Sequence, residues 1–384
     1  MKLYDLLDKE KLDHHIREGF VNVNEHPSLP LLILNYTPRA AFANAWGDGT
    51  LDYCRGLIFN QHTREIVARP FKKFHNFQTP SIPETLLENL PTDTPDITVK
   101  MDGSLGIWYP DGTQEGAIAT RGSFTSPQAL WATNWWKTCG AVNSLYTPWE
   151  DVWTPLFEII YPENRIVVDY GNRKDLVVIG GVYIESGKEV SRRLLVDTFE
   201  NKVVKHFDVP NAYTLQQISE HNYPNEEGYV LTYANGLKIK IKFEDYKRLH
   251  KLITGVNPRV IWEMLRDDEW LDETNLPDNF RAWLHKWSDY LQGQFLDIIE
   301  AARIIFASRP IHVVHYPVEQ SLKYHRAECA RYFSASTEDK KHLLPVLFAL
   351  LDGKNPAPII WKQIEPAGND QRFKYSVDAA AEAE

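Results

Sequence analysis

The chain has 384 residues, a formal net charge of −10, 43% hydrophobic residues and 12% aromatic residues. This composition predicts a folded globular protein of two or three domains and excludes a chain that is disordered throughout. The acidic total argues against a uniformly basic protein that coats nucleic acid, although a local basic site is compatible with it. The 3 cysteines are widely spaced and form no CxxC pair, so neither a disulfide framework nor a cysteine zinc site is expected.

Membrane segments are not expected in this sequence. Residues 1–20 are charged and periodic, whereas a signal peptide requires an apolar stretch. No apolar run approaches the roughly 18 residues that a membrane-spanning helix needs. We therefore expect a cytoplasmic protein without a membrane partner.

The N-terminal two thirds of the chain is predicted to consist mainly of strands. It begins with a helical segment whose expected inner face is Leu3, Leu6, Leu7 and Ile16. The clearest β-branched or aromatic runs are residues 31–36, 54–60, 96–100, 105–109, 175–184, 228–233 and 237–243, separated by turn signals. One helix is expected around residues 127–137.

After about Thr254 the pattern changes from strand to helix. Asn257 and Pro258 form a typical helix start, with asparagine as the N-cap and proline at the first helical position. Amphipathic helices are predicted over residues 280–306, 319–333 and 337–351. The fold class expected from these patterns is α+β, with a strand-rich first domain and an all-α C-terminal domain.

Four short segments combine reactive side chains with strand-like surroundings. Lys100, followed by Asp102 and a glycine, is either presented to a ligand or is the exposed lysine of an ordinary hairpin. Glu227 precedes Gly228 at the start of a strand, where a carboxylate either holds a divalent cation or merely begins the strand. Glu158 is a single acid inside an apolar strand, so it needs a partner such as an arginine or a ribose hydroxyl.

Three lysines alternate with apolar residues in the fourth segment, residues 237–243. Because strand side chains alternate between faces, Lys238, Lys240 and Lys242 share one face. Such a face is often simply solvated, but three like charges repel one another and are better explained if the face meets an anion.

Along the chain the order of the four segments is Lys100 with its glycine turn, then Glu158, then Glu227 with Gly228, then the lysines of residues 237–243. Motifs in this order resemble the nucleotidyltransferase superfamily of ATP-dependent ligases and capping enzymes. Residues 54–59 and 69–77 are similar to the segments that precede the nucleophilic lysine in RNA ligases. With its helical C-terminal part, the chain most closely resembles the bacteriophage type-1 RNA ligase family, over about residues 30–250. The resemblance implies an antiparallel-sheet adenylyltransferase domain, residues 1–252, followed by an all-helical domain, residues 253–384, that could bind RNA.

The resemblance also implies roles for individual residues. Lys100 becomes the covalent nucleophile, Glu227 a metal or transfer-step carboxylate, and Tyr246 a tyrosine needed for activity. The nucleotide-binding residues that it implies are Tyr36, Arg55, Lys73, Gly103, Arg121, Glu158, Gly228, Lys240 and Lys242. Converging cations would hold the ATP phosphates and disfavour the ammonium form of the nucleophile.

The reaction implied by the resemblance is RNA ligation. Lys100 attacks the α-phosphate of ATP and expels pyrophosphate, AMP passes from the lysine to an RNA 5′-phosphate, and a 3′-hydroxyl then displaces AMP. The implied cofactors are ATP and Mg²⁺. The implied partner is RNA with 5′-phosphate and 3′-hydroxyl ends, such as a broken tRNA, and a phage-encoded enzyme would act in the host cytoplasm.

Several positions depart from the family pattern or admit two interpretations. Arg121 and His75 stand where relatives usually have lysine and phenylalanine. Lys238 lies on the same face as Lys240 and Lys242 and could substitute for one of them. Asp102 either binds a metal or orients its loop through local hydrogen bonds.

The C-terminal part has two features with alternative interpretations. Asp272 lies in an acidic cluster, residues 267–273, which is either a solvated helix end or, by resemblance, a magnesium site. Basic and aromatic residues alternate over residues 323–341, which suits RNA binding but is also ordinary amphipathic helix composition.

Two alternatives to an RNA ligase follow from the same motifs. A DNA ligase or capping-type enzyme generally carries a β-barrel after the lysine-rich strand, where this sequence predicts helices. A non-catalytic RNA-binding scaffold would be expected to lack the nucleophile or the paired lysines, whereas Lys100, Lys240 and Lys242 are present.

Overall fold

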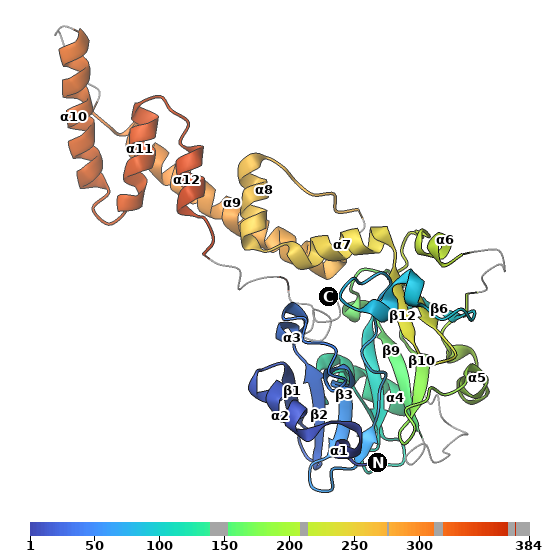
Figure 1. Cartoon of the computed structure of the whole chain (residues 1–384). Coiled ribbons are helices and arrows are strands. Elements are labelled where there is room, and N and C mark those ends of the chain that lie inside the picture. Colours follow the sequence, from blue (N-terminus) through green and yellow to red (C-terminus); the bar gives the residue numbers. More distant parts are fainter. Residues whose placement is uncertain (139–152, 208–213, 275, 311–317, 368–372, 374–384) are drawn as a thin grey trace. The chain divides into compact units, whose positions relative to one another are not determined.

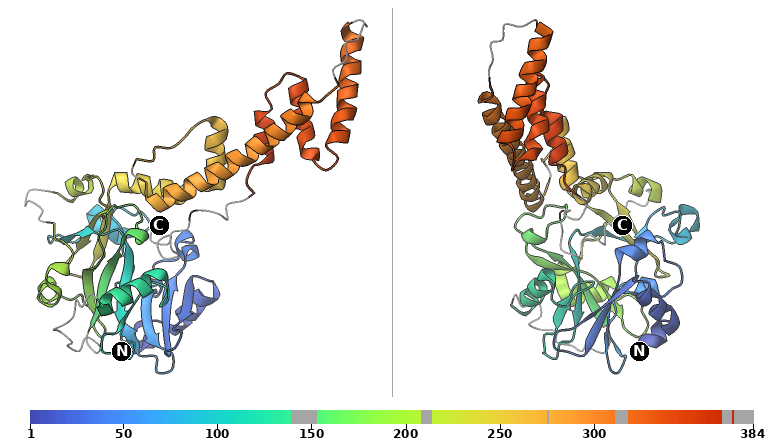
Figure 2. Two further views of the ribbon diagram at one scale, coloured as in Figure 1. Left: turned by 180° about the vertical axis from the view of Figure 1, so that it is seen from behind. Right: turned by 90° about the vertical axis from the view of Figure 1, so that its left-hand side faces the viewer.

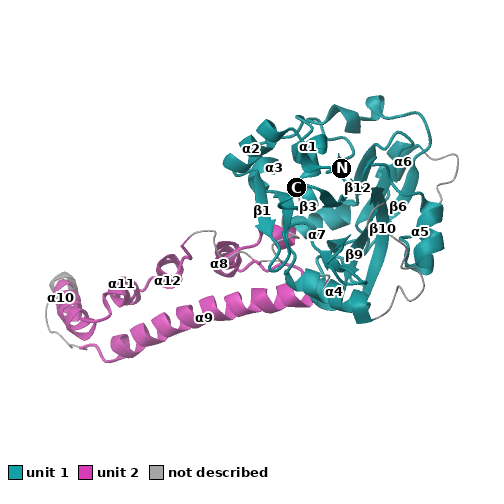
Figure 3. Ribbon diagram, turned by 90° about the horizontal axis from the view of Figure 1, so that it is seen from below, with its two compact units in different colours: residues 1–251, 374–384 teal, residues 252–373 magenta. Residues whose placement is uncertain are grey.

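The computed structural model describes residues 1–138, 153–207, 214–274, 276–310, 318–367 and 373 (Figure 1). The chain divides into two compact units, residues 1–251 with 374–384 and residues 252–373, which Figure 3 colours separately. We call them unit 1 and unit 2. Of the helices in the described ranges, none is both long and apolar enough to cross a membrane.

The described residues of unit 1 form three four-stranded sheets. The first has the order β1-β2-β3-β4, with β1 at Val21–Glu25, β2 at Leu31–Tyr36, β3 at Arg55–Asn60 and β4 at Ile66–Ala68. The second has the order β10-β9-β7-β8, with β7 at Ser104–Tyr109, β8 at Ala117–Ala119, β9 at Trp153–Ile160 and β10 at Asp175–Tyr183. The third has the order β5-β12-β11-β6, with β5 at His75–Asn76, β6 at Asp96–Lys100, β11 at Gly228–Thr232 and β12 at Lys238–Lys242.

Neighbouring strands are antiparallel except β5 and β12, which are parallel. The helices of unit 1 are α1 (Leu3–Leu6), α2 (Lys9–Arg17), α3 (Pro38–Phe42), α4 (Pro127–Thr138), α5 (Arg192–Phe199) and α6 (Leu215–Ser219). Helix α7 (Glu244–Gly255) runs across the boundary between the units. The mixed α+β architecture with antiparallel sheets confirms that part of the predicted fold class.

Strand β2 shows why the first two sheets pack face to face. Its Leu32, Leu34 and Tyr36 are buried in a cluster with residues of α1, α2 and α3. Leu31 and Ile33 point the other way, because strand side chains alternate, and are buried with residues of the second sheet. A strand covered on both faces gives the nearly continuous apolar run seen in the sequence.

The layers of unit 1 follow from these two clusters and a third (Figures 1 and 2). Helices α1–α3 cover the outer face of the first sheet, and α4 and α5 cover the outer face of the second. Trp136 of α4 and Phe199 of α5 pack there against Phe157 of β9. The inner faces of the two sheets meet between these layers, so a polar side chain on an inner face, such as Glu158, faces the interior of the sandwich.

The predicted N-terminal helix is present as two helices, α1 and α2, because Asp8 caps the second one. Leu3 and Leu7 are buried as predicted. Ile16, however, is 37% exposed, and Leu12 is buried one turn earlier. The expectation for Ile16 is wrong because the break at Asp8 changes which side of the second helix faces the sheet.

Unit 2 has helices in its described residues: α8 (Pro258–Asp267), α9 (Asp278–Ala307), α10 (Val318–Ser336), α11 (Leu344–Leu351) and α12 (Ala357–Gln363). Asn257 caps α8 as predicted, by accepting hydrogen bonds from the backbone of Arg259 and Val260. The helix predicted over residues 337–351 is wrong in its first half. It is replaced by a 3-10 turn at Lys341–Leu343 and α11, which has a proline in its first turn, where proline favours a helix start.

Candidate active site

The third sheet of unit 1 brings three of the predicted motifs into one row. Lys100 ends β6 and lies opposite Gly228 of β11, which lies opposite Lys242 of β12. Glu227 immediately precedes Gly228, so its carboxylate lies between the two lysines. Its Oε2 is 2.7 Å from Lys100 Nζ and its Oε1 is 3.2 Å from Lys242 Nζ.

Glu227 is only 3% exposed, so its charge state depends on its neighbours. Burial raises the pKa of this carboxyl group, but the ammonium groups of Lys100 and Lys242 more than offset that effect and hold the pKa of Glu227 below its usual value. Glu227 is therefore a carboxylate at neutral pH. The motifs predicted cations around Lys100 but not the buried anion that its Nζ pairs with. Of those cations, Lys242 shares Glu227 with Lys100, and Arg55 lines a cavity together with Lys100.

Asp102, two residues after Lys100, orients the loop that follows β6. Its Oδ2 accepts hydrogen bonds of 2.8 Å from the backbone N–H groups of Val167 and Val168, and the Tyr246 hydroxyl donates to its Oδ1 at 2.9 Å. These bonds bear out the interpretation that Asp102 fixes the loop. Tyr246, predicted to be catalytic, thus contacts Asp102 and also packs beneath the Lys242 ammonium, 5.1 Å from its ring centroid.

The burial of Asp102 predicts how the folding stability of the protein depends on pH. Burial and the nearby Glu227 charge raise the pKa of Asp102 from 3.8 to about 6. Between these values the folded protein binds a proton that the unfolded chain has lost, so this group's contribution to stability falls as pH rises from about 4 to about 6. In urea unfolding, the stability of the wild type relative to Asp102→Asn should fall across that window. A pH-independent difference would contradict the assignment.

Glycine is required at two positions of the site, because a neighbouring backbone carbonyl lies too close to leave room for a Cβ. A Cβ on Gly103 would lie 2.6 Å from the Ile159 carbonyl oxygen and 3.1 Å from Glu158 Cγ. A Cβ on Gly228, whose φ is +146°, would lie 1.9 Å from the Ile241 carbonyl oxygen. Both glycines therefore let the loop after Lys100 and the strand after Glu227 reach their positions.

We predict that Gly228→Ala destabilises the fold by more than about 2 kcal/mol, because both the backbone angle and the clash with a carbonyl oppose it. Gly236→Ala is the matched control. Gly236 also has a positive φ, +86°, but a Cβ there meets nothing within 4 Å, so only the cost of the backbone angle, about 1 kcal/mol, is expected. Equal denaturation midpoints for the two variants would refute this account of Gly228.

A small cavity of about 60 Å³ lies beside Lys100. Its polar lining includes Arg55, Lys100 and Glu158. Its apolar walls include Val99, Met101, Ile179, Val204 and Val230. This volume is well below the roughly 300–1,000 Å³ of a pocket that encloses a whole ligand, so the cavity marks the surroundings of Lys100 and not a complete nucleotide pocket.

Tyr36, Lys73 and Arg121 form a separate cluster of cations and aromatic rings. Arg121 Nη1 donates to the Tyr36 hydroxyl at 3.1 Å. Lys73 Nζ lies 4.7 Å from the Tyr36 ring centroid and 4.3 Å from that of Trp46. Sequence reasoning missed Trp46, because an isolated tryptophan in a loop carries no periodic signal.

His75 belongs to the same surroundings. Its ring packs edge-on against Trp46, with centroids 5.7 Å apart. Burial, together with the ammonium groups of Lys73 and Lys240, lowers the pKa of His75 to about 4. His75 is therefore neutral at physiological pH and contributes no charge to the cluster.

The three lysines of β12 have different partners. Lys242 pairs with Glu227, as described above. Lys240 lies opposite Val230 in the sheet, with its Nζ 5.9 Å from the Phe74 ring centroid. Lys238 Nζ pairs with Glu189 at 2.9 Å and donates to the Thr232 hydroxyl at 2.7 Å.

Asp272, the predicted metal ligand, belongs to unit 2. It is exposed, and its Oδ1 accepts hydrogen bonds from the backbone and hydroxyl of Thr274. Within the described ranges no group of three or more His, Cys, Asp and Glu side chains is arranged to hold a metal. A Mg²⁺ ion that is bound largely through the phosphates of a nucleotide needs only one or two protein carboxylates.

Comparison with known proteins gives a family match. The family model for RNA ligase of the T4 RNA ligase 1 type matches residues 53–246, half of the chain. A protein of Autographa californica nuclear polyhedrosis virus, named as a bifunctional polynucleotide kinase/RNA ligase, is 26% identical over 262 residues. That match covers 60% of this chain and 35% of the viral protein, so the chain spans about a third of its relative's length.

Solved structures of RNA ligases are similar to this structure only at low TM-scores. An archaeal ATP-dependent RNA ligase overlaps 91% of this chain and 96% of its own, with 12% identity and a TM-score of 0.45. A Naegleria gruberi RNA ligase with ATP and Mn overlaps 47% of this chain and 58% of its own, with 18% identity and a TM-score of 0.38. These TM-scores are too low to assign the fold by themselves.

Proposed function

This chain belongs to the RNA ligase family of the T4 RNA ligase 1 type, and we propose that it seals RNA at the expense of ATP. It joins 5′-phosphate and 3′-hydroxyl ends through lysyl-AMP and adenylylated RNA. The observation that carries this proposal is the Lys100–Glu227–Lys242 row beside a cavity that also contains Glu158. A lysine at a cavity edge can be presented to an α-phosphate, and the cations beside it can bind phosphate oxygens.

In the first step, Lys100 Nζ attacks the α-phosphate of ATP and pyrophosphate leaves. Attack requires a lone pair on Nζ, so the hydrogen bond to Glu227 has to open or transfer its proton to the carboxylate. Glu158 binds the ribose, and Lys240 and Lys242 bind the α-phosphate. Bound Mg²⁺ supplies charge neutralisation at the phosphates.

The remaining nucleotide contacts come from the cluster around Tyr36. Lys73 binds the outgoing phosphates together with Arg55 of the small cavity, and Tyr36 and Arg121 form part of the nucleotide pocket. Trp46 and Tyr36 fix the ammonium group of Lys73 between their rings. Burial of Lys73, which is 8% exposed, supports a fixed rather than a solvated cation.

In the second and third steps, AMP passes from Lys100 to an RNA 5′-phosphate, and the 3′-hydroxyl then attacks that phosphate as AMP leaves. Tyr246 acts in these steps through Asp102, which holds the nucleophile loop. Adenylylation removes the charge of Lys100 and so ends its ion pair with Glu227, whose carboxylate could then hold a divalent ion, which would supply charge neutralisation at the incoming RNA phosphate.

The domain roles are also proposals. Residues 1–252 form the adenylyltransferase domain, and residues 253–384 form an all-helical domain that binds RNA, such as a broken tRNA. The helices described in unit 2 support this assignment. Asp272 would bind a magnesium ion there, and the enzyme, if phage-encoded, would act in the host cytoplasm.

The proposal is tested by sealing assays with ATP, Mg²⁺ and a 5′-phosphorylated RNA strand. We expect a joined product, and we expect joining to slow by about tenfold or more when the acceptor ends in a 2′-deoxynucleotide, because the 2′-hydroxyl distinguishes RNA from DNA. Equal rates with the two acceptor ends would contradict the assignment of RNA as the substrate. Absence of joining in both would refute the ligase assignment.

A further inference from the structure

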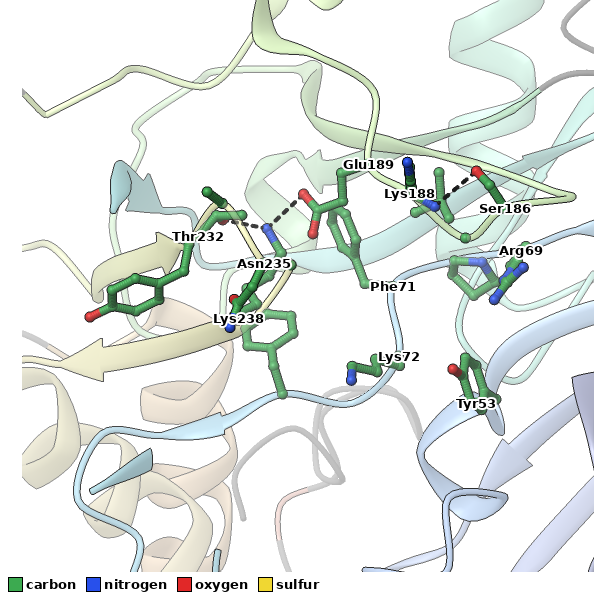
Figure 4. Close-up of a pocket in the computed structure, with 17 residues that line it drawn as sticks. Tyr53, Arg69, Phe71, Lys72, Ser186, Lys188, Glu189, Thr232, Asn235 and Lys238 are labelled. Carbon is green, nitrogen blue, oxygen red and sulfur yellow. Dashed lines mark hydrogen bonds and ion pairs between the residues drawn. The ribbon is translucent and has the colours of Figure 1, made fainter. Parts of the chain in front are cut away.

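A second and larger cavity lies next to the candidate active site. It has a volume of about 560 Å³ and is formed by Tyr53 and by three segments, residues 69–74, 182–189 and 232–238 (Figure 4). Figure 4 shows the labelled side chains of these segments around one common space. No role for this cavity follows from the nucleotide-binding assignments made above.

The cavity is rich in positive charge although the chain as a whole is acidic. Four cationic side chains line it, Arg69, Lys72, Lys188 and Lys238, against one carboxylate, Glu189. The carboxylate is already paired with Lys238 at 2.9 Å. Among the described residues, no carboxylate forms an ion pair with any of the other three cations.

Arg69 is a buried cation in the wall of the cavity, held in a fixed position by backbone carbonyl groups. It is 6% exposed, and its Nη1 donates to the carbonyl oxygens of Ile184, at 2.8 Å, and Glu185, at 3.4 Å. Carbonyl groups satisfy its N–H groups without neutralising its charge. A buried cation without an anionic partner is costly, so its presence on a cavity wall indicates that an anion completes the site.

The cavity adjoins the smaller one that contains Lys100. Both cavities are lined by Phe71, Phe74 and Lys238. A molecule in the larger cavity therefore lies on the far side of these shared residues from the cavity of the nucleophile. This position suits a substrate that follows the nucleotide, rather than the nucleotide itself.

We propose that the larger cavity binds backbone phosphates of the single-stranded RNA that is being sealed, an inference that rests on the proposed ligase function. Lys72 and Lys188 are exposed and can meet a strand arriving from solvent, while Arg69 is fixed at the wall. Tyr53 is half-buried, with the Arg69 guanidinium 5.6 Å from its ring centroid, and its ring offers an aromatic surface to a base. A free pyrophosphate would use neither this ring nor most of the volume.

The test compares Lys72→Glu/Lys188→Glu with a matched control, Lys9→Glu/Lys174→Glu. All four lysines are exposed and lie in unit 1, and neither Lys9 nor Lys174 lines either cavity. Binding of a fluorescent 5′-phosphorylated single-stranded RNA to the full chain is measured by anisotropy over a range of salt concentrations. Transfer of label from ATP to the protein is measured without RNA.

For the cavity variant we expect RNA affinity to fall by at least about tenfold at low salt and the logarithmic salt slope to shrink by about 1.4, the contribution of two phosphate contacts. Labelling by ATP should equal that of the control. The milder Lys72→Ala/Lys188→Ala should show an intermediate loss, which separates lost contacts from repulsion.

Unchanged RNA binding in both cavity variants would overturn the proposal. A loss of ATP labelling without a loss of RNA binding would also overturn it, since the cavity would then bind the nucleotide. A third contrary result would come from adding pyrophosphate to protein with equal amounts of bound RNA, if pyrophosphate displaced the RNA from the wild type but not from the variant. If the wild type binds RNA through these lysines yet is never labelled by ATP, the ligase function fails while the phosphate site stands.

Discussion

Replacing Lys100 with alanine or arginine is expected to abolish sealing with ATP while sparing the joining of RNA that already carries a 5′-adenylate. Lys100 is the only residue to which the proposed mechanism gives a covalent role, and it is used in the first two steps. Its removal should slow ATP-dependent sealing by at least about a thousandfold, the order expected for loss of a covalent nucleophile. Arginine keeps the positive charge but cannot supply a nucleophilic amine at neutral pH.

The matched control for this prediction is Lys174→Ala. Lys174 is an exposed lysine of the same unit and lines neither cavity, so its removal should change neither activity. Joining rates with ATP plus 5′-phosphate RNA, and with adenylylated RNA alone, are measured for all variants. If Lys100→Ala still seals with ATP, another nucleophile must carry AMP.

Glu227→Gln is expected to produce the second large effect, a loss of about 2–4 kcal/mol of unfolding free energy. The substitution keeps the shape of the side chain but leaves the ammonium groups of Lys100 and Lys242 without their shared carboxylate. Removing one partner of a buried ion pair costs several kcal/mol, because the remaining charge stays in a poorly solvated place. The two lysine side chains are 17% and 11% exposed, so solvent screens them only in part.

A double-mutant cycle with Lys100→Met separates this electrostatic effect from a packing effect. If the ion pair carries the cost, Lys100→Met/Glu227→Gln should be more stable than the sum of the two single losses predicts. Urea unfolding at neutral pH provides the free energies. Additive losses would show that Glu227 stabilises the fold by some means other than its pairing with Lys100.

Much of the site could be predicted because its chemistry is carried by local patterns. Lys100, Glu227 and Lys242 each stand at the end of a strand whose alternation is visible in the sequence. The pairing of β6, β11 and β12 then places them in one row. The order of the motifs along the chain was enough to suggest that they meet.

What the sequence could not show depends on long-range contacts. The hydrogen bond from Tyr246 to Asp102 joins residues 144 positions apart, and the ion pair of Lys100 with Glu227 joins residues 127 apart. Motif order suggests that such groups are neighbours, but it does not say which anion faces which cation. The ion pair between Lys100 and the buried Glu227 was not predicted for this reason.

Short strands and loop contacts were also not predicted from the sequence. Strands β5 and β8 have two and three residues, too few for a period of two to be recognised. Trp46 lies outside any strand, and its contact with Lys73 depends on how the loop after α3 folds back. The larger cavity could not be predicted because its lining comes from three segments that are distant in sequence, and none of them carries a recognisable motif.

The central claim is that AMP becomes covalently attached to Lys100. The most direct test is to incubate the purified chain with ATP and Mg²⁺ in the absence of RNA, and to map any adduct by mass spectrometry of proteolytic peptides. The account predicts one acid-labile AMP on the peptide that contains Lys100, released when 5′-phosphorylated RNA is added. No adduct under these conditions, or an adduct on a different residue, would contradict it.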